Sequence, residues 1–349
     1  MIMKTFTNLF KSALFALLLT VVSVNVNAQD EEGPALTFSG SVDTYYRTNL
    51  NAVYTEAPGS SFANQHGFAV GMANIITSIE GEKSGFVADL VFGPRGTDAV
   101  FGSTTASSSI VNQLYAYWNA TESVTFTIGN FNTFLGYEVI SPTANYNYST
   151  SYMFSYGPFS HSGLKADIAL GDASLMLGVF NPTDATDFNP SGKYVFGAQL
   201  GYGGVYLNSI LSDDFYQFDV TAGWDLTDAL YLGINATTAK DNFFGAAIYL
   251  QNSFSDDFSM GVRAEYFSDE GVGALPDTNL YDAFGTVVTP GFIATNVIDL
   301  TLSANYSVGA LTFIPELRVD LFDEDVVAES STKAGSSLAS FVLAAVYAF

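Results

Sequence analysis

The sequence predicts an all-β protein: a transmembrane, antiparallel, up-and-down β-barrel of about 16 strands. Three observations lead to this prediction. The composition is apolar and poor in charge, no segment after the N-terminus is apolar for the length of a membrane-spanning helix, and alternating apolar and polar residues recur between turns. Only helices and closed barrels pair all of their backbone groups in lipid. A chain that enters a membrane without helices must therefore close a barrel.

The composition also excludes several classes of function. Of 349 residues, 13% are charged, and 35 acidic against 11 basic side chains give a net charge of −24. This excess of acid argues against nucleic acid as a partner, because phosphates are bound by clustered Lys and Arg. The chain has no Cys, which excludes disulfides, a thiolate nucleophile and Cys metal sites.

The N-terminal segment has the order of a secretory signal peptide. Basic residues precede a short apolar core at 13–24, and a small-residue site ends at Ala28. The alternative is a membrane anchor, which needs about 20 apolar residues. We therefore predict that 1–28 are a signal peptide and that 29–349 form a single outer-membrane barrel domain.

The strands are predicted from alternation. Between residues 311 and 322 the odd positions are apolar, and the even ones include Glu316, Arg318 and Asp320. Pro315 lacks a donor for the ladder, so we expect a local bulge there. Sixteen strands are predicted to begin near residues 36, 67, 85, 110, 121, 160, 173, 193, 204, 215, 228, 243, 257, 295, 310 and 338.

The connections between these strands alternate in length. All the long ones follow odd-numbered strands: 50–66, 95–109, 131–159, 181–192, 269–294 and 323–337. Outer-membrane barrels have short periplasmic turns and longer extracellular loops, which predicts that both termini are periplasmic. Residues 201–204 are predicted to form a tight turn, because paired glycines favour one. A soluble β-sandwich or β-solenoid, the alternative, explains the alternating lengths poorly.

The last strand, from residue 338, carries an apolar row that includes Tyr347 and ends at Phe349. A final strand of this kind resembles the outer-membrane β-barrel signal that the barrel-assembly machinery reads. Tyr347 and Phe349 are therefore the candidate assembly signal.

A second resemblance lies in the first half of the chain, in the segments 38–46, 85–96 and 124–168. The most specific positions are Gly129, the Phe-x-Thr at 131–133, the Gly-Tyr-Glu at 136–138, the Asn-Tyr-Ser at 147–149 and the His-Ser-Gly at 161–163. These segments are similar to the putative β-barrel porin-2 family of outer-membrane porins. The resemblance implies a porin-like barrel, and it brings no catalytic residue with it.

The predicted lumen contains both signs of charge, with more acid than base. Sixteen strands leave an aqueous channel, and rings of carboxylates are typical of cation pores. The alternative is that these charges pair locally. The pore-lining candidates are Asp43, Arg47, Asp89, Lys165, Asp167, Lys193, Asp219, Arg263, Glu265, Asp299, Glu316, Arg318 and Asp320.

Residues 131–159 form the longest predicted loop, which is rich in Phe and Tyr and has Glu138 as its only charge. A loop this apolar should fold against the lumen wall. We therefore expect it to dip inward and narrow the pore. Glu138, Tyr146, Tyr148 and Tyr152 are the constriction candidates. The alternative is a loop that extends the wall above the membrane or packs on a neighbouring subunit.

These observations predict a non-enzymatic channel for passive diffusion of small solutes, with some preference for cations. The alternatives are a substrate-specific channel or receptor and a closed barrel with a structural or adhesive role. No catalytic, cofactor or metal site is predicted. The expected partners are outer-membrane lipids and lipopolysaccharide, the assembly machinery, small solutes or ions, and further copies of the chain. The expected location is the outer membrane of a Gram-negative-type bacterium.

Overall fold

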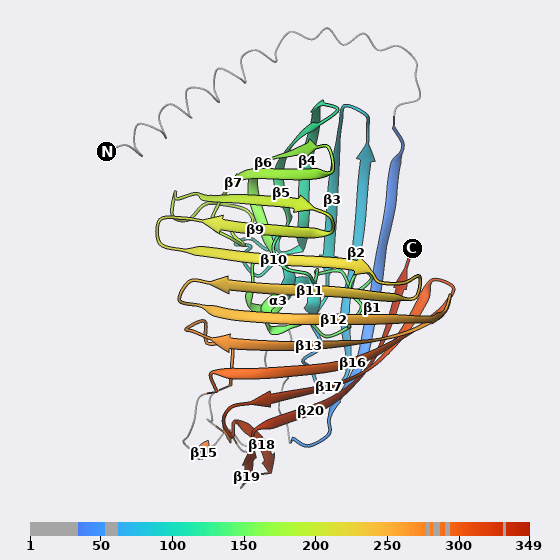
Figure 1. Cartoon of the computed structure of the whole chain (residues 1–349), viewed down its shortest axis with the longest axis vertical. Coiled ribbons are helices and arrows are strands. Elements are labelled where there is room, and N and C mark those ends of the chain that lie inside the picture. Colours follow the sequence, from blue (N-terminus) through green and yellow to red (C-terminus); the bar gives the residue numbers. More distant parts are fainter. Residues whose placement is uncertain (1–33, 53–61, 277–279, 282–286, 290–293, 331–332) are drawn as a thin grey trace. The chain divides into compact units, whose positions relative to one another are not determined.

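The structure is a computed structural model that describes residues 34–52, 62–276, 280–281, 287–289, 294–330 and 333–349. Residues 36–349 form one compact unit, in which 16 antiparallel strands close a barrel (Figure 1). The predicted signal peptide lies outside the described residues. None of the helices that the structure describes is long and apolar enough to cross a membrane.

Each strand pairs with the next in the chain, and the last pairs with the first. In order around the ring they are β1 (Leu36–Asn49), β2 (Gly67–Glu80), β3 (Ser84–Phe92), β4 (Val111–Thr121), β5 (Val124–Asn132), β6 (Ser160–Leu170), β7 (Ala173–Phe180), β8 (Val195–Tyr202), β9 (Val205–Leu211), β10 (Tyr216–Asp225), β11 (Leu230–Ala239), β12 (Phe243–Ser255), β13 (Phe258–Asp269), β16 (Asn296–Val308), β17 (Leu311–Phe322) and β20 (Ser337–Ala348). The predicted starts are confirmed, and the largest difference is at β5, predicted near 121 and found at Val124.

The two ends of the barrel differ. At one, the short-turn end, neighbouring strands are joined by tight turns such as the one at Gly203 and Gly204, whose φ angles of 60° and 81° suit glycine. That turn was predicted. The other, the long-loop end, carries the long connections with their small elements: α2 (Pro94–Ala99), η1 (Ser108–Ile110), α3 (Tyr152–Tyr156), the pair β14 (Leu280–Tyr281) and β15 (Val287–Thr289), and the pair β18 (Val327–Ser330) and β19 (Lys333–Gly335). Gly40 and Phe349 exchange backbone hydrogen bonds, so the first and last strands meet at the short-turn end.

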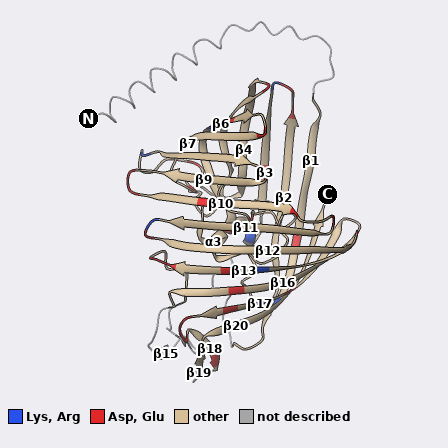
Figure 2. Ribbon diagram, in the orientation of Figure 1, with Lys and Arg blue, Asp and Glu red and all other residues tan. Residues whose placement is uncertain are grey.

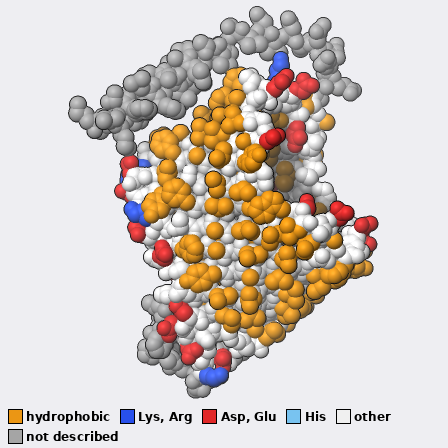
Figure 3. Space-filling model, viewed as in Figure 1, with side chains coloured by type: hydrophobic (Ala, Val, Ile, Leu, Met, Phe, Trp, Pro, Cys, Tyr) orange, Lys and Arg blue, Asp and Glu red, His pale blue; other side chains and the backbone are white. Residues whose placement is uncertain are grey.

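The two faces of the wall are opposite in character. Along β17, Leu317 and Leu321 are exposed on the outside, whereas Glu316, Arg318 and Asp320 are buried on the inside. Apolar side chains are spread over the face of the wall seen in Figure 3, and charged residues gather at the strand ends and at a few strand positions (Figure 2). A barrel with an apolar outside and a polar inside is built for lipid.

The bulge predicted at Pro315 is wrong. Phe313 and Glu316 pair with Tyr306 and Ser303 in one unbroken register, and Pro315 itself pairs with Leu343 on β20. Because a proline removes only its own donor, the pairs on either side keep the strand in place.

A bulge lies on β2 instead: between the pairs Val42–Ala73 and Thr44–Val70, Asp43 on β1 stands opposite both Gly71 and Met72. The Asp43 carboxylate accepts the backbone N–H of Met72 there, at 2.9 Å. The Asp43 side chain thus accepts from a backbone N–H that the shifted ladder leaves without a backbone partner.

Candidate functional site

The loop between β5 and β6 crosses the inside of the barrel. The Gly136 N–H donates to Asp219 on β10 at 3.1 Å, and Arg95, which follows β3, donates through Nε to the Ile140 carbonyl at 3.1 Å. Because β3 and β10 are third and tenth in a ring of 16 strands, they face each other nearly across the lumen. The loop therefore runs from one wall to the other.

One wall carboxylate, Glu316, receives the middle of this loop. It accepts the backbone N–H groups of Tyr148, at 2.9 Å, and Ser149, at 3.2 Å. The Ser303 hydroxyl donates to the same carboxylate at 2.8 Å. Loop N–H groups that would otherwise be buried without partners are thereby satisfied.

A second wall carboxylate, Glu265, holds the start of α3. It accepts the N–H groups of Tyr152 and Met153, both at 2.8 Å, and the Ser151 side chain accepts that of Phe154. These donors have no partner within the helix, and a negative charge beside them is favourable.

Two arginines connect the loop to the wall acids. Arg263 donates to Glu138 at 2.7 Å and to Asp299 at 2.9 Å. Arg318 donates to Asp299 and to Asp320, both at 2.8 Å. Both arginines also donate to backbone carbonyls of the loop. The Ser149 carbonyl accepts from Arg263, and the Thr150 carbonyl accepts from Arg318. This charged cluster, Glu138, Arg263, Asp299, Arg318 and Asp320, is almost fully buried.

Two further inward acids have amide partners, and neither forms an ion pair with a described residue. Asp89 accepts from Asn112 at 2.7 Å and from Asn74 at 3.3 Å. Asp219 accepts from Asn208 at 2.7 Å and from Asn235 at 2.6 Å. Amide donors compensate for part of the cost of burying each carboxylate.

Most of the predicted pore-lining side chains are thus covered by the loop and by one another. Those at most 7% exposed are Asp43, Arg47, Asp89, Asp219, Arg263, Glu265, Asp299, Glu316, Arg318 and Asp320. Lys165 and Asp167 form a partly exposed ion pair on β6, at 2.9 Å. Lys193 lies before β8, where it is exposed and pairs with Asp214. The role of all these residues in conduction stays a prediction.

The four constriction candidates also divide into buried and half-buried side chains. Glu138, Tyr148 and Tyr152 are buried, and the Tyr148 hydroxyl donates to Asp43 at 2.5 Å. Burial raises the pKa of Tyr148 and of Tyr152 well above the ordinary tyrosine value. Tyr146 is half-buried, and its hydroxyl donates to Ser259 at 3.0 Å. Only Tyr146 therefore borders open space.

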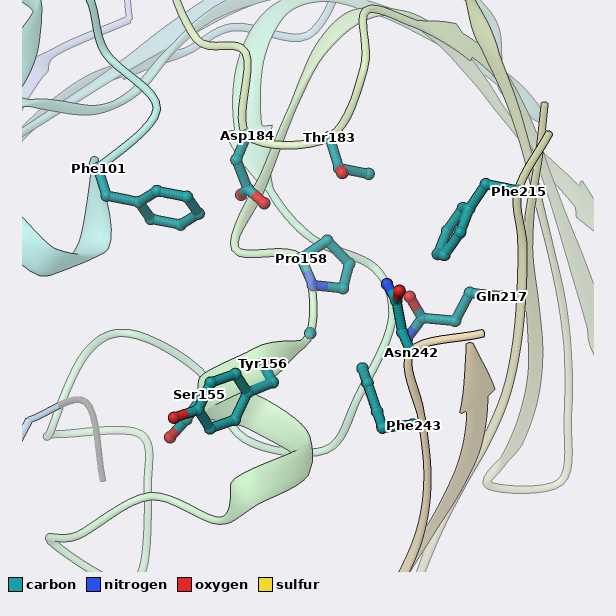
Figure 4. A pocket seen from close by; sticks show the side chains of 11 residues that line it. Phe101, Ser155, Tyr156, Pro158, Thr183, Asp184, Phe215, Gln217, Asn242 and Phe243 are labelled. Carbon is teal, nitrogen blue, oxygen red and sulfur yellow. The ribbon is translucent and has the colours of Figure 1, made fainter. Parts of the chain in front are cut away.

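Two cavities adjoin the loop. At the long-loop end, a cavity of about 160 Å³ lies between α3 and the wall, with Phe101 and Asp184 on one side and Phe215 and Phe243 on the other (Figure 4). At the short-turn end, a cavity of about 650 Å³ lies between residues 142–146 and the ends of six strands. Among the residues that the structure describes, no three His, Asp or Glu side chains gather as metal ligands would.

The family model described as Putative beta-barrel porin-2, OmpL-like, matches residues 35–349. The chain belongs to this family. The curated proteins contain no sequence that matches it.

Solved structures share the fold of this porin family member at low identity. OprB of Pseudomonas putida is 12% identical with a TM-score of 0.58, covering 90% of this chain and 94% of its own. OmpF of Salmonella typhi, solved in complex with daunomycin, is 13% identical with a TM-score of 0.57, covering 91% and 98%. A trimer form of OmpT, an outer membrane protein of Vibrio cholerae, is 12% identical with a TM-score of 0.55, covering 91% and 100%. At these identities the likeness shows the fold, which is that of outer-membrane barrels.

Sequence reasoning missed one inward arginine of this porin family member. Arg95 is buried, and its guanidinium lies 4.4 Å from the ring centre of Phe62 and 5.2 Å from that of Tyr148. Its two terminal nitrogens, like those of Arg47, have no hydrogen-bond partner in the described structure. Arg95 comes after a predicted strand, in the segment Pro-Arg-Gly, where side chains are no longer expected to alternate between the two faces. The alternation therefore did not predict that Arg95 points inward.

Proposed function

We propose that the protein is an outer-membrane channel through which small solutes diffuse passively, with residues 131–159 as its constriction. The observation that supports this most is the crossing loop, anchored through Glu265 and Glu316 inside a closed barrel with an apolar outer face. In this proposal the short-turn end faces the periplasm, and residues 1–28 are removed on export.

A preference for cations is part of the proposal. The buried charged side chains include eight acids, counting Glu138 in the loop, and four arginines, Arg47, Arg95, Arg263 and Arg318, which leaves four more carboxylates than cations. Carboxylate-rich pores favour cations. The preference should weaken as salt rises, because the long-range attraction between a mobile cation and the carboxylates of the pore is screened beyond about 8 Å at physiological ionic strength.

The test is the current through the purified protein in a planar bilayer, with its reversal potential in a salt gradient. Deleting residues 142–158 should raise the conductance and admit larger solutes, because it removes the segment held by Glu265 and Glu316. Deleting residues 189–192, in an exposed loop, is the matched control. Unchanged conductance in a folded 142–158 deletion would reject the constriction, and a reversal potential of the anionic sign would reject the cation preference.

The proposal also covers assembly. Tyr347 and Phe349 end β20 with exposed rings, where the barrel closes on β1. We expect Phe349→Asp to lower surface yield more than the 189–192 deletion does, because a charge replaces the final aromatic of the assembly signal. Normal yield of Phe349→Asp, measured in isolated outer membranes, would contradict this.

The remaining proposed partners are lipids and lipopolysaccharide around the apolar face, and further copies of the chain. The trimer form described for OmpT of Vibrio cholerae supports testing for a trimer. Cross-linking in native membranes gives the measurement, and a single monomeric band at every cross-linker concentration would argue against an oligomer.

A further inference from the structure

The cavity at the short-turn end is lined by uncharged residues only. Its loop side is formed by Tyr137 and residues 142–146, and its wall side by the ends of β11, β12, β13, β16, β17 and β20. The charged cluster begins deeper in the lumen, at Arg263. A solute in this cavity would therefore meet polar and aromatic groups without a counter-ion for a charge of its own.

Two tyrosines, Tyr146 and Tyr231, line this cavity and are half-buried. Each occupies space above a glycine of the wall: a Cβ atom on Gly261 would lie 2.5 Å from the Tyr146 ring, and one on Gly223 would lie 2.0 Å from the Tyr231 hydroxyl. Glycine at these two positions thus leaves the room that the tyrosines need beside the cavity.

Tyr137 completes the aromatic lining from the loop. Its ring stacks on that of Tyr249, with centroids 4.1 Å apart and planes 20° apart, and it also packs over Gly233. Because Tyr249 covers one face of its ring, Tyr137 supports the cavity wall, and Tyr146 and Tyr231 supply the other aromatic rings of the lining.

The polar lining consists of amides and hydroxyls that can both donate and accept, at Gln251, Ser259, Asn305, Ser307 and Thr312. Asn305 donates to the Tyr146 carbonyl at 3.1 Å. Together with the Tyr146–Ser259 hydrogen bond, this contact fixes the Tyr146 ring against the wall. These polar groups are therefore held on or next to strands, and the two hydrogen bonds hold the loop residue Tyr146 beside them.

We propose that this cavity binds a neutral oligosaccharide of two or three sugar units, an inference that rests on the proposed channel and names a solute class for it. A pyranose ring has an apolar C–H face, which packs on the electron-rich face of an aromatic ring, and hydroxyls that both donate and accept. Burying a charged solute here would leave its charge unpaired. The volume of about 650 Å³ lies within the usual range for small-molecule sites.

The first test is calorimetric titration of the folded protein in detergent with maltotriose as the probe. We expect saturable binding that Tyr231→Ala weakens about five- to tenfold, because an aromatic ring of the cavity lining is lost. Tyr231→Phe keeps the ring and should bind like the unchanged protein, so it controls for folding. Tyr202→Ala removes a tyrosine from the same end of the barrel but on the outer face, where the side chain is 68% exposed, and should change nothing.

Three results would overturn the inference: no saturable binding of maltotriose, equal binding by Tyr231→Ala, or tighter binding of adenosine or succinate than of maltotriose. The second test separates this inference from the channel. A protein that conducts ions, with a current that maltotriose does not block saturably, contradicts the sugar site alone. A protein that binds maltotriose without conducting contradicts the channel and leaves the site.

Discussion

Along β13, the inward positions change in character within a few residues. Near the short turn, Ser259 and Gly261 are neutral and lie at the open cavity and against Tyr146, whereas Arg263, Glu265 and Phe267 are at most 2% exposed. The neighbouring β16 repeats the change, with Asn305 and Ser307 at the cavity and Asp299 buried. One half of the lumen holds the loop, and the other half leaves room for a solute.

The difference teaches that charge in this lumen serves first to fix the backbone of the loop. Glu265 and Glu316 accept N–H groups from the loop, and Arg263 and Arg318 donate to its carbonyls. Each of these interactions replaces water that the loop backbone would otherwise need. The excess of inward acid therefore anchors the loop, whatever it contributes to the ion preference that we propose.

The largest expected effect comes from breaking the charged cluster at its centre. Arg263→Met should lower the free energy of unfolding by about 3–5 kcal/mol, because Glu138 and Asp299 would stay buried without their common partner. It should also raise conductance and current noise as the loop loosens. Thermal unfolding followed by gel mobility gives the first quantity, and bilayer recording gives the second.

The matched control for Arg263→Met is Lys193→Met, which removes a surface ion pair with Asp214. Water and salt screen an exposed pair, so this variant should unfold almost as the unchanged protein does. Equal effects of the two substitutions would mean that the buried cluster does not hold the loop.

A smaller effect sharpens the comparison within β13 itself. Glu265→Gln keeps an oxygen acceptor for only one of the N–H groups of Tyr152 and Met153, which bond to different carboxylate oxygens, and should destabilise the protein by about 1–3 kcal/mol. Ser259→Ala, six residues away on the same inner face, should cost less than about 0.5 kcal/mol. Chemical unfolding of both variants measures these losses of stability. If Ser259→Ala lost more stability than Glu265→Gln, the half of the lumen at the cavity, and not the half with the buried charges, would hold the loop.

The strands and faces of this barrel were predictable because alternation is a local property. The neighbours Leu317 and Arg318 point outward and inward, as their types predict, and no other part of the chain is needed to know it. The short-turn end was predictable for the same reason, since Gly203 and Gly204 determine their own turn.

The partners of the inward charges were not predictable in this way. Local pairing, the simpler expectation, occurs for Lys165 with Asp167 and for Arg318 with Asp320. Arg263, in contrast, reaches Glu138, 125 residues away, because the crossing loop brings that acid to it. No periodicity in the sequence encodes such a contact. The neutral cavity was missed for the same reason, because it exists only between the folded loop and the wall.

The smallest expected effect concerns the point where the loop returns to the wall at the long-loop end. The Asp184 carboxylate accepts the N–H groups of Phe159 and Ser160, at 2.8 and 2.9 Å, and burial raises its pKa to about 6. Because the pKa of Asp184 in the folded protein lies above the unfolded value of about 3.9, folding favours the protonated carboxyl. Its contribution to the free energy of unfolding is full below about pH 4 and is lost as the pH rises through 6. We therefore expect the midpoint of thermal unfolding to fall as the pH rises from 4 to 7. Asp184→Asn keeps an acceptor and cannot ionise, so its midpoint should vary less over this range.

The control is Asp187→Asn, three residues along the chain. Hydrogen bonds, first from Ser108, lower the pKa of Asp187 to about 2, so its ionisation does not change between pH 4 and 7. If Asp184→Asn retains the full pH dependence, another group causes it, and the return of the loop to the wall is not sensitive to pH.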